Sequence, residues 1–115
     1  MLSSGDVVVL DFPGVQGIKR RPAVILSSDL YHASRPDVII GLITSQTSSA
    51  VGPTDYTLVD WAAAGLRLPS AFRAFLVTLP VPPETARIGT LSETDWREVQ
   101  ARIRATIAAC EHAQP

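Results

Sequence analysis

The sequence predicts a mainly β protein with some α structure (α+β), folded as a small, strongly twisted barrel or half-barrel closed by a C-terminal helix. Two observations indicate this class. Short apolar runs rich in β-branched residues alternate with turn-forming residues as far as Leu91, as expected of strands. From Ser92 onward, apolar residues recur at every third or fourth position, as on one face of a helix. The length of 115 residues corresponds to one domain, which we expect to span residues 1–115.

The first two predicted strands lie on either side of a glycine-containing loop and a basic run. A strand is predicted over 7–12, a flexible loop over 14–19, and a second strand over 23–27. Pro22 has no N–H for a sheet ladder, which favours the first residue of a strand or an edge. The residue before a proline is pushed towards extended geometry, so Arg21 is expected at the mouth of the second strand.

Four further strands complete the predicted sheet. They are expected over 38–44, 56–59, 71–79 and 88–91, with polar connections over 28–37 and 45–54. Gly41, inside an otherwise apolar strand, indicates a bulge or a close backbone approach. Asp60 can cap a one-turn helix over 61–64, and Gly65 fits the position after its last turn. In the strand over 71–79, alternate residues from Phe72 are expected to face one way.

The C-terminal segment predicts a helix from about Glu93 to Ala109. Ser92 and Asp95 resemble a capping box, with Asp in the place usually taken by Glu or Gln. The residues expected on its apolar face are Trp96, Val99, Ile103, Ile107 and Cys110. Cys110 is therefore interpreted as a packing residue rather than a reactive thiol.

Composition excludes several classes of function. Ten basic and 11 acidic residues give a net charge of −1, so a polyanion would have to be held by a local patch rather than by bulk charge. A single cysteine and two distant histidines offer no disulfide and no metal-ligand spacing, so neither a metal nor a cofactor is expected. With no signal-peptide pattern at the N-terminus and no apolar run of roughly 18 residues, a cytoplasmic protein without a membrane span is expected.

Two neighbouring strand ends carry the candidate site. The run Lys19-Arg20-Arg21 holds three of the ten basic residues at consecutive positions, and a guanidinium on a rigid strand end can be aimed at an anion. Such a run can also be solvated surface charge. Thr44 ends the next strand, so its hydroxyl would share one edge with Arg21, although it can equally bond a turn backbone. Arg73 can pair with Asp60 or Glu84 instead of joining a site.

The order and spacing of several short motifs resemble the MazF/PemK toxins of bacterial toxin–antitoxin pairs. These motifs are Gly5-Asp6-Val7-Val8, Asp11-Phe12-Pro13, Arg20-Arg21-Pro22-Ala23-Val24-Ile25, Ile43-Thr44-Ser45, and Ile88-Gly89-Thr90-Leu91-Ser92 before a helix. The run from Asp60-Trp61 through Gly65-Leu66, Pro69-Ser70 and Arg73 is similar to one branch of the family. The resemblance covers about residues 5 to 108.

The resemblance implies an SH3-like barrel that acts as a sequence-selective endoribonuclease on single-stranded RNA without a metal. The family's catalytic arginine and threonine fall on Arg21 and Thr44, and Ser28 occupies the place of a further polar residue. A planar guanidinium can stabilise the charge that develops on a phosphate when the RNA 2′-hydroxyl attacks it. RNA contacts are expected from Lys19, Arg20, Ser28, Ser45, Gln46, Ser70 and Arg73.

The same resemblance and the composition together indicate the partners. Apolar strands around a small core favour a homodimer, and a basic groove suits an antitoxin with a disordered acidic segment that folds along it. The alternative is a barrel of the CcdB type that binds DNA gyrase and cleaves nothing, or a binding module that has lost nuclease activity. Arg21 and Thr44 discriminate between these hypotheses, because a nuclease needs both and a gyrase binder needs neither.

Overall fold

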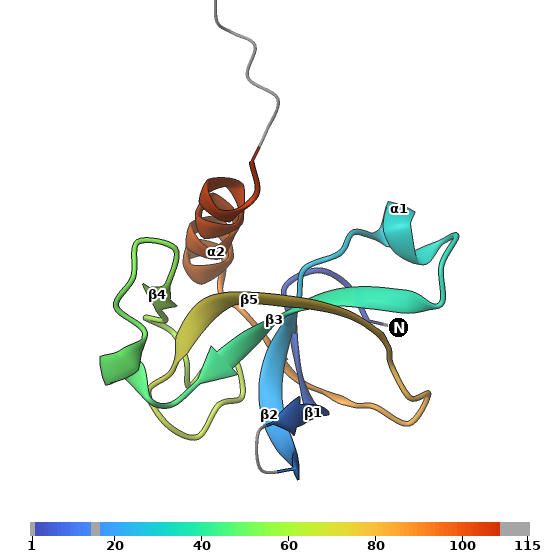
Figure 1. The fold of residues 1–115 in the computed structure, drawn as a ribbon, viewed down its shortest axis with the longest axis horizontal. Coiled ribbons are helices and arrows are strands. Elements are labelled where there is room, and N and C mark those ends of the chain that lie inside the picture. The colour runs from blue at the N-terminus through green and yellow to red at the C-terminus, as the bar shows by residue number, and fades with distance from the viewer. Residues whose placement is uncertain (1, 15–16, 109–115) are drawn as a thin grey trace, which may run out of the picture.

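The computed structural model describes residues 2–14 and 17–108 of the chain (Figure 1). Its strands are β1 (Asp6–Gly14), β2 (Gly17–Ile25), β3 (Asp37–Thr44), β4 (Tyr56–Thr57), β5 (Ala71–Pro80) and β6 (Arg87–Thr90). Its helices are α1 (Asp29–His32), the single 3-10 turn η1 (Thr47–Ser49) and α2 (Glu93–Thr106). The β-branched and aromatic runs of the sequence thus form strands, and the segment with helical periodicity forms α2.

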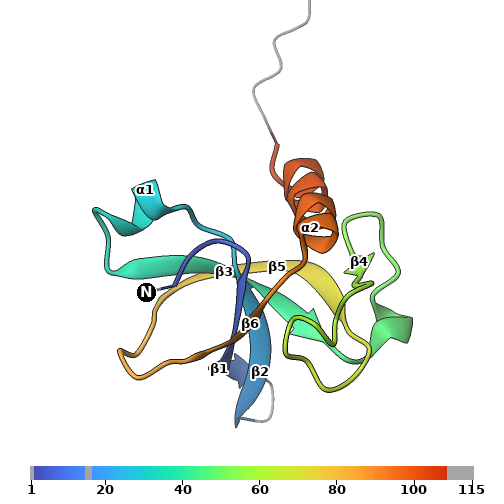
Figure 2. The same ribbon diagram turned by 180° about the vertical axis from the view of Figure 1, so that it is seen from behind.

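The strands form one antiparallel sheet in the order β4-β5-β3-β2-β1-β6. The sheet curls strongly, the β1–β2 hairpin projects from it, and α2 lies beside β4 and β5 at one end, as Figures 1 and 2 show from opposite sides. The predicted α+β half-barrel closed by a C-terminal helix is therefore confirmed.

The core has two clusters because alternate residues of each strand face opposite sides of the curled sheet. The cluster on the α2 side consists of Val7, Val24, Ile43, Leu58, Ala64, Phe72, Leu91 and Val99. The cluster on the other side consists of Val8, Leu10, Phe12, Ala23, Ile25, Val38 and Ile40. The predicted alternation in β5 is confirmed, since Ala74 and Leu76 pack on the Phe72 side and Val77 packs on the other.

Gly41 shows both features that the sequence indicated. The pairing of β3 with β5 shifts register between Gly41 and Leu42, and the unpaired residues of this bulge, Ala74 and Phe75, lie on β5. A Cβ at Gly41 would also overlap the Phe72 ring, so the absent side chain lets this large core residue lie flat against β3. The irregularity falls just before the last three residues of β3, which end at Thr44.

The predicted flexible loop over 14–19 is wrong. β1 continues to Gly14 and β2 begins at Gly17, so the basic run lies inside a hairpin strand, where Arg20 faces Asp11 on the neighbouring strand. Charge and glycine content suggested a loop, but exposed strand positions accept long charged side chains because their heads stay in water.

Pro22 correspondingly lies inside β2 rather than at its start. The pairing of β2 with β3 ends at Ala23, the residue after Pro22. The missing N–H therefore removes no ladder bond on the β3 side, and a proline is tolerated there. Beyond Ala23 the strands β2 and β3 are not paired, so the sheet is open at this end.

The expected helix over 61–64 forms a hydrogen-bonded turn instead of a helix. The N–H of Leu66 donates to the Trp61 carbonyl at 3.2 Å, and that of Gly65 donates to the Ala62 carbonyl at 3.1 Å. This is the bond pattern that ends helices at a left-handed residue, and Gly65 has a φ of 88°, as its predicted position after the last turn requires. The single turn is too short to propagate.

The ends of α2 differ in how well the sequence predicted them. Ser92 caps the helix as expected, accepting a bond from the Asp95 N–H at 3.1 Å. The helix stops at Thr106 rather than near Ala109, and Ile107 is exposed instead of continuing the apolar face. Cys110 lies outside the described residues. Within the described residues, no helix is long and apolar enough to cross a membrane.

Candidate active site

A cavity of about 450 Å³ lies where β2 and β3 separate. Side chains from β1, β2, β3, the β4–β5 connection and β6 contribute to it. The lining residues are Val9, Arg20, Arg21, Pro22, Ile43, Thr44, Ser45, Gly65, Leu66, Arg67, Leu68, Ser70 and Ile88. The cavity is therefore assembled from segments far apart in the sequence.

Sheet register brings Arg21 and Thr44 together. Ala23 of β2 pairs with Leu42 of β3 in the last pair of this ladder, and Arg21 and Thr44 each lie two residues beyond that pair. Residues two apart on a strand point to the same face, so Arg21 lies on the face of Ala23, Thr44 lies on the face of its partner Leu42, and the two share a side. Both line the cavity, as the sequence predicted for two neighbouring strand ends.

The Thr44 hydroxyl is held by the turn after β3. Thr44 is buried, and its Oγ1 accepts a hydrogen bond from the backbone N–H of Gln46 at 3.1 Å. The bond to a turn backbone, which was the structural alternative for this residue, is thus present. A hydroxyl that accepts one bond still has its proton to donate, and the stiff χ1 of threonine fixes its direction. The turn bond therefore orients Thr44 as a donor.

Arg20 and Arg21 occupy different environments although they are adjacent. The Arg20 guanidinium pairs with Asp11 at 3.1 Å and donates to the Val9 carbonyl at 3.3 Å. Arg21 is half-buried opposite Leu10 in the hairpin. Arg20 is thus tied to β1, whereas Arg21 lies on the face that it shares with Thr44.

The charge of this cavity differs from that of the whole chain. Its lining contains three arginines, Arg20, Arg21 and Arg67, and among the described residues no carboxylate lines it. The chain as a whole carries a net charge of −1. Positive charge in a concave site attracts anions more strongly than the same charge spread over a surface. The lining is therefore locally basic, and its chemistry suits an anion such as phosphate.

A rigid turn builds the opposite wall of the cavity. Gly65 lies directly against β6, because a Cβ there would overlap the Ile88 carbonyl, and a Cβ at Gly89 would overlap the Ala64 carbonyl. Leu68, three residues after this contact, and Ile88 both line the cavity, and both side chains are exposed, at 58% and 40%. The cavity thus has a basic side and an apolar side.

Asp95 of α2 fastens the start of the same connection. Its carboxylate is fully buried and accepts bonds from the Tyr56 hydroxyl at 2.6 Å, the Val59 N–H at 3.0 Å and the Asp60 N–H at 2.8 Å. Burial raises the pKa of Tyr56, and the bond to Asp95 raises it further, so the phenol stays protonated and donates. Three donors compensate the buried charge, as such a group requires. The wall is therefore anchored at both ends.

The structure brings some of the predicted RNA-contacting residues to this cavity and places others elsewhere. Besides Arg21 and Thr44, the lining includes Arg20, Ser45 and Ser70.

The other predicted contacts lie outside the lining. Lys19 is exposed near the hairpin tip, and Ser28 caps α1 by accepting a bond from the Tyr31 N–H. Gln46 precedes η1, and Arg73 is exposed opposite Leu42 on β5 and pairs with neither of the two carboxylates considered for it.

Sequence reasoning missed Arg67 as a cavity residue. It stands alone between two leucines, so no charge run drew attention to it. The available signal was Gly65, which predicted a fixed turn two residues earlier and hence a fixed direction for the residues after the turn. It also missed the buried role of Asp95, because a capping position explains an aspartate without any tertiary contact.

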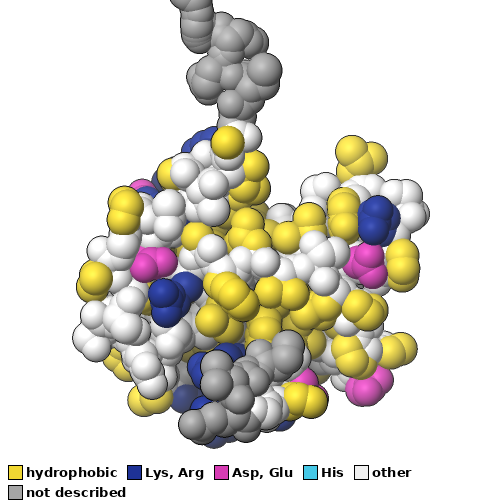
Figure 3. All heavy atoms as spheres, viewed as in Figure 1, with side chains coloured by type: hydrophobic (Ala, Val, Ile, Leu, Met, Phe, Trp, Pro, Cys, Tyr) yellow, Lys and Arg dark blue, Asp and Glu magenta, His cyan; other side chains and the backbone are white. Residues whose placement is uncertain are grey.

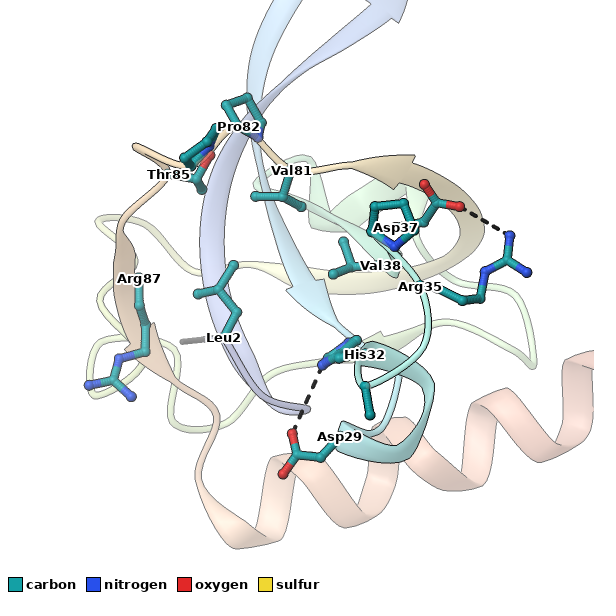
Figure 4. A pocket seen from close by; sticks show the side chains of 13 residues that line it. Leu2, Asp29, His32, Arg35, Asp37, Val38, Val81, Pro82, Thr85 and Arg87 are labelled. Atoms are coloured by element: carbon teal, nitrogen blue, oxygen red, sulfur yellow. Dashed lines mark hydrogen bonds and ion pairs between the residues drawn. The ribbon is translucent and has the colours of Figure 1, made fainter.

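A larger cavity of about 830 Å³ lies at the other end of the molecule, between α1 and the β5–β6 connection. Figure 4 shows Leu2, Val38 and Val81 around its centre, with Arg35 and Arg87 on opposite sides. The Arg35 guanidinium pairs with Asp37 at 3.1 Å, and that of Arg87 lies 3.6 Å from Asp6. The charges here are paired, so size alone does not make this the better anion site. Among the described residues, no group of three or more His, Cys, Asp or Glu could hold a metal ion.

Solved structures share this fold. MazE–MazF (Form-III) from Deinococcus radiodurans superposes with a TM-score of 0.71 at 20% identity, covering 91% of this chain and 94% of that one. An endoribonuclease in complex with its cognate antitoxin, from a mycobacterial species, gives a TM-score of 0.70 at 16% identity, covering 91% and 93%.

Sequence comparison identifies the family. Endoribonuclease MazF6 of Mycobacterium tuberculosis (strain ATCC 25618 / H37Rv) is 36% identical over 95 residues, which cover 79% of this chain and 81% of the relative. Endoribonuclease MazF2 of Mycobacterium bovis shows the same identity and coverage. The family described as PemK-like, MazF-like toxin of type II toxin–antitoxin system matches residues 3–107. With the half-barrel and the arginine–threonine pair in place, the chain belongs to this family of PemK-like, MazF-like toxins.

Proposed function

We propose that this protein is the toxin of a type II toxin–antitoxin system and cleaves single-stranded RNA internally, without a metal. The observation that carries the proposal is the cavity that joins Arg21 and Thr44 within a basic, carboxylate-free lining among the described residues. The family and the names of the 36%-identical relatives support the same activity.

The reaction uses the RNA's own 2′-hydroxyl as nucleophile. Its oxygen forms a bond to the adjacent phosphorus, the bond from phosphorus to the 5′-oxygen breaks, the 2′ proton is lost and the leaving oxygen gains a proton. The phosphate becomes more negative on the way to the transition state. Arg21 meets this charge with the planar fork of donors of its guanidinium, which can bind two phosphate oxygens at once.

Thr44 contributes a second donor to the same phosphate. Its oxygen is engaged by the Gln46 N–H, so the hydroxyl proton points to another acceptor. A fixed donor needs no reorganisation when the charge develops, which is the advantage of preorganised sites. Holding the phosphate between two strand ends also favours the in-line geometry that the attack needs.

The test is a cleavage assay in EDTA with single-stranded and duplex RNA of mixed sequence. The wild type is expected to cut the single strands internally and to leave duplexes largely intact. Arg97→Ala is the matched control, because it removes an exposed arginine on α2, outside the cavity. Complete dependence on magnesium or manganese contradicts the mechanism. Intact RNA across many sequences contradicts the activity and favours a binding module that has lost nuclease activity.

A cytoplasmic homodimer with an antitoxin partner completes the proposal. Hydrophobic side chains gather on the face over β3 and β5 in Figure 3, and Phe75 on β5 is 56% exposed, so a second copy would cover apolar surface. Light scattering should give about twice the chain mass of 12.3 kDa. A monomer at micromolar concentration would remove the dimer from the proposal.

The antitoxin is expected to present a disordered, acidic segment to the basic cavity. Carboxylates can bind where phosphates bind, and the apolar wall offers contacts that salt does not screen. Competition between this segment and RNA is the measurement. An antitoxin that binds tightly while cleavage continues unchanged would show that it covers another surface.

A further inference from the structure

We propose that Arg67, Leu68 and Ile88 form a nucleotide subsite next to the cleaved bond, in which the apolar pair holds a base and Arg67 binds a flanking phosphate. The inference rests on the proposed function and names residues that determine which RNA is cut. The connection from β4 to β5 thereby gains a role in RNA binding, separate from that of β2 and β3, which carry Arg21 and Thr44.

The composition of the wall fits one nucleotide. A base is a flat apolar body that gains from contact with apolar side chains, and its sugar carries phosphates on either side. Leu68 and Ile88 expose apolar surface to the cavity, although exposed large aliphatic side chains are otherwise unfavourable in water. Arg67 adds a cation on the same short segment as Leu68, and both side chains line the cavity.

The wall has little freedom to move. The contact of Gly65 with the Ile88 carbonyl and of Gly89 with the Ala64 carbonyl joins the turn to β6 through backbone atoms. The Ser70 hydroxyl donates to the Leu68 carbonyl at 2.8 Å, which fixes the far end of the segment. A rigid wall selects among bases, because a misfitting base cannot be accommodated by loop movement.

The three arginines of the cavity have separable tasks in this arrangement. Arg21 shares a sheet face with Thr44 at the cleaved phosphate, and Arg20 is paired with Asp11. Arg67 is exposed and comes from the connection between β4 and β5 rather than from β2. A single strand bound in the cavity therefore meets a second cation from a separate segment.

Binding is measured with 2′-fluoro RNA, which lacks the nucleophile and so reports affinity independently of cleavage. Arg67→Ala should weaken binding about tenfold and reduce the slope of log affinity against log salt by about 0.7, the value for one phosphate contact on a single strand. Arg97→Ala, an arginine removed from the exposed side of α2, should change neither quantity.

Base selection is measured by sequencing the products from RNA of random sequence. Leu68→Ala should relax the preference at one position next to the cut by about threefold or more, since an aliphatic contact that discriminates bases is lost. Leu30→Ala is the control, because Leu30 is an 84% exposed leucine on α1, outside the cavity. Thermal unfolding of each variant separates these effects from misfolding.

The outcomes separate the subsite from the proposed function. Wild-type protein that binds and cuts RNA, with Arg67→Ala indistinguishable from Arg97→Ala, overturns the phosphate contact and leaves the nuclease standing. An unchanged preference at every position in Leu68→Ala overturns the base contact in the same way. Wild-type protein that neither binds nor cuts RNA overturns both proposals together.

Discussion

Replacing Asp95 should be among the most destabilising single changes in this protein. Its carboxylate is fully buried and accepts three hydrogen bonds, from the Tyr56 hydroxyl and the N–H groups of Val59 and Asp60. A bond to a charged group contributes about 1.5–3 kcal/mol, so three sum to roughly 4–9 kcal/mol. The two backbone donors lie near the surface and regain water, so we expect Asp95→Ala to lower the free energy of unfolding by about 3–5 kcal/mol.

The amide variant isolates the charge from the shape. In Asp95→Asn one oxygen still accepts from Tyr56 and Val59, but the amide N–H₂ then faces the Asp60 N–H, donor against donor. We expect a loss of about 2–3 kcal/mol, or roughly 10 °C in Tm for a chain of this size.

Urea unfolding followed by tryptophan fluorescence measures the effect. Trp61 in the turn and Trp96 on α2 both pack against the cluster on the α2 side, so they report the region that Asp95 joins. Glu93→Gln is the matched control, because Glu93 is an exposed acid in the first turn of the same helix and shares its dipole contribution. Losses within about 0.5 kcal/mol of each other for Asp95→Asn and Glu93→Gln would refute the reasoning. All samples are compared at one protein concentration, since association shifts stability.

Three further results are expected. Arg21→Ala should slow RNA cleavage, measured as an initial rate, by about 10²–10³-fold. Arg21→Lys should recover little of the wild-type rate, and Thr44→Ala should slow cleavage less than Arg21→Ala does. A lysine variant near the wild-type rate would contradict the role of a planar guanidinium. Because folding raises the pKa of Tyr56, the folded protein keeps a proton that the unfolded chain releases near pH 10. The stability that the protonated Tyr56 contributes is therefore complete below about pH 10 and is lost as pH rises beyond it. Urea unfolding at pH 8 and pH 11 should therefore show a smaller alkaline loss in Tyr56→Phe than in the wild type, and equal losses would count against this coupling. Gly65→Ala should lower the free energy of unfolding by about 2–4 kcal/mol in thermal unfolding, because the position has a positive φ and a Cβ there overlaps a backbone carbonyl. Gly52→Ala is the control and should lower it little, because a Cβ there meets only ordinary contacts. Equal losses for the two variants would contradict the reasoning.

Elements with a strong local pattern could be predicted from the sequence, and so could the pairing of the two catalytic candidates. Thr44 ends an apolar strand and Arg21 precedes a proline, and both signals are local. Their meeting results from antiparallel neighbours, which short connections favour. The cap at Ser92 and the left-handed Gly65 were equally readable, because each depends on a few adjacent residues.

Features that depend on tertiary contact could not be predicted in the same way. Strands β1 and β2 extend through the basic run because each residue there gains a pairing partner on the other strand. No local sequence signal shows how far two strands remain paired. The burial of Asp95 requires donors about 35 to 39 residues away, at Tyr56, Val59 and Asp60. Arg67 became a cavity residue only once the turn before it was seen to lie on β6.

The backbone contact between Gly65 and Gly89 has a consequence for how the protein can diverge. Because main-chain atoms join the turn to β6, the fold depends at this point on two missing side chains rather than on the identity of Arg67 or Leu68. Those two side chains are exposed and belong to neither core cluster, so replacing them should alter folding little. A lineage could therefore explore many residue pairs at these positions while keeping the same scaffold. Libraries randomised at these two codons would vary the proposed subsite while the scaffold is kept.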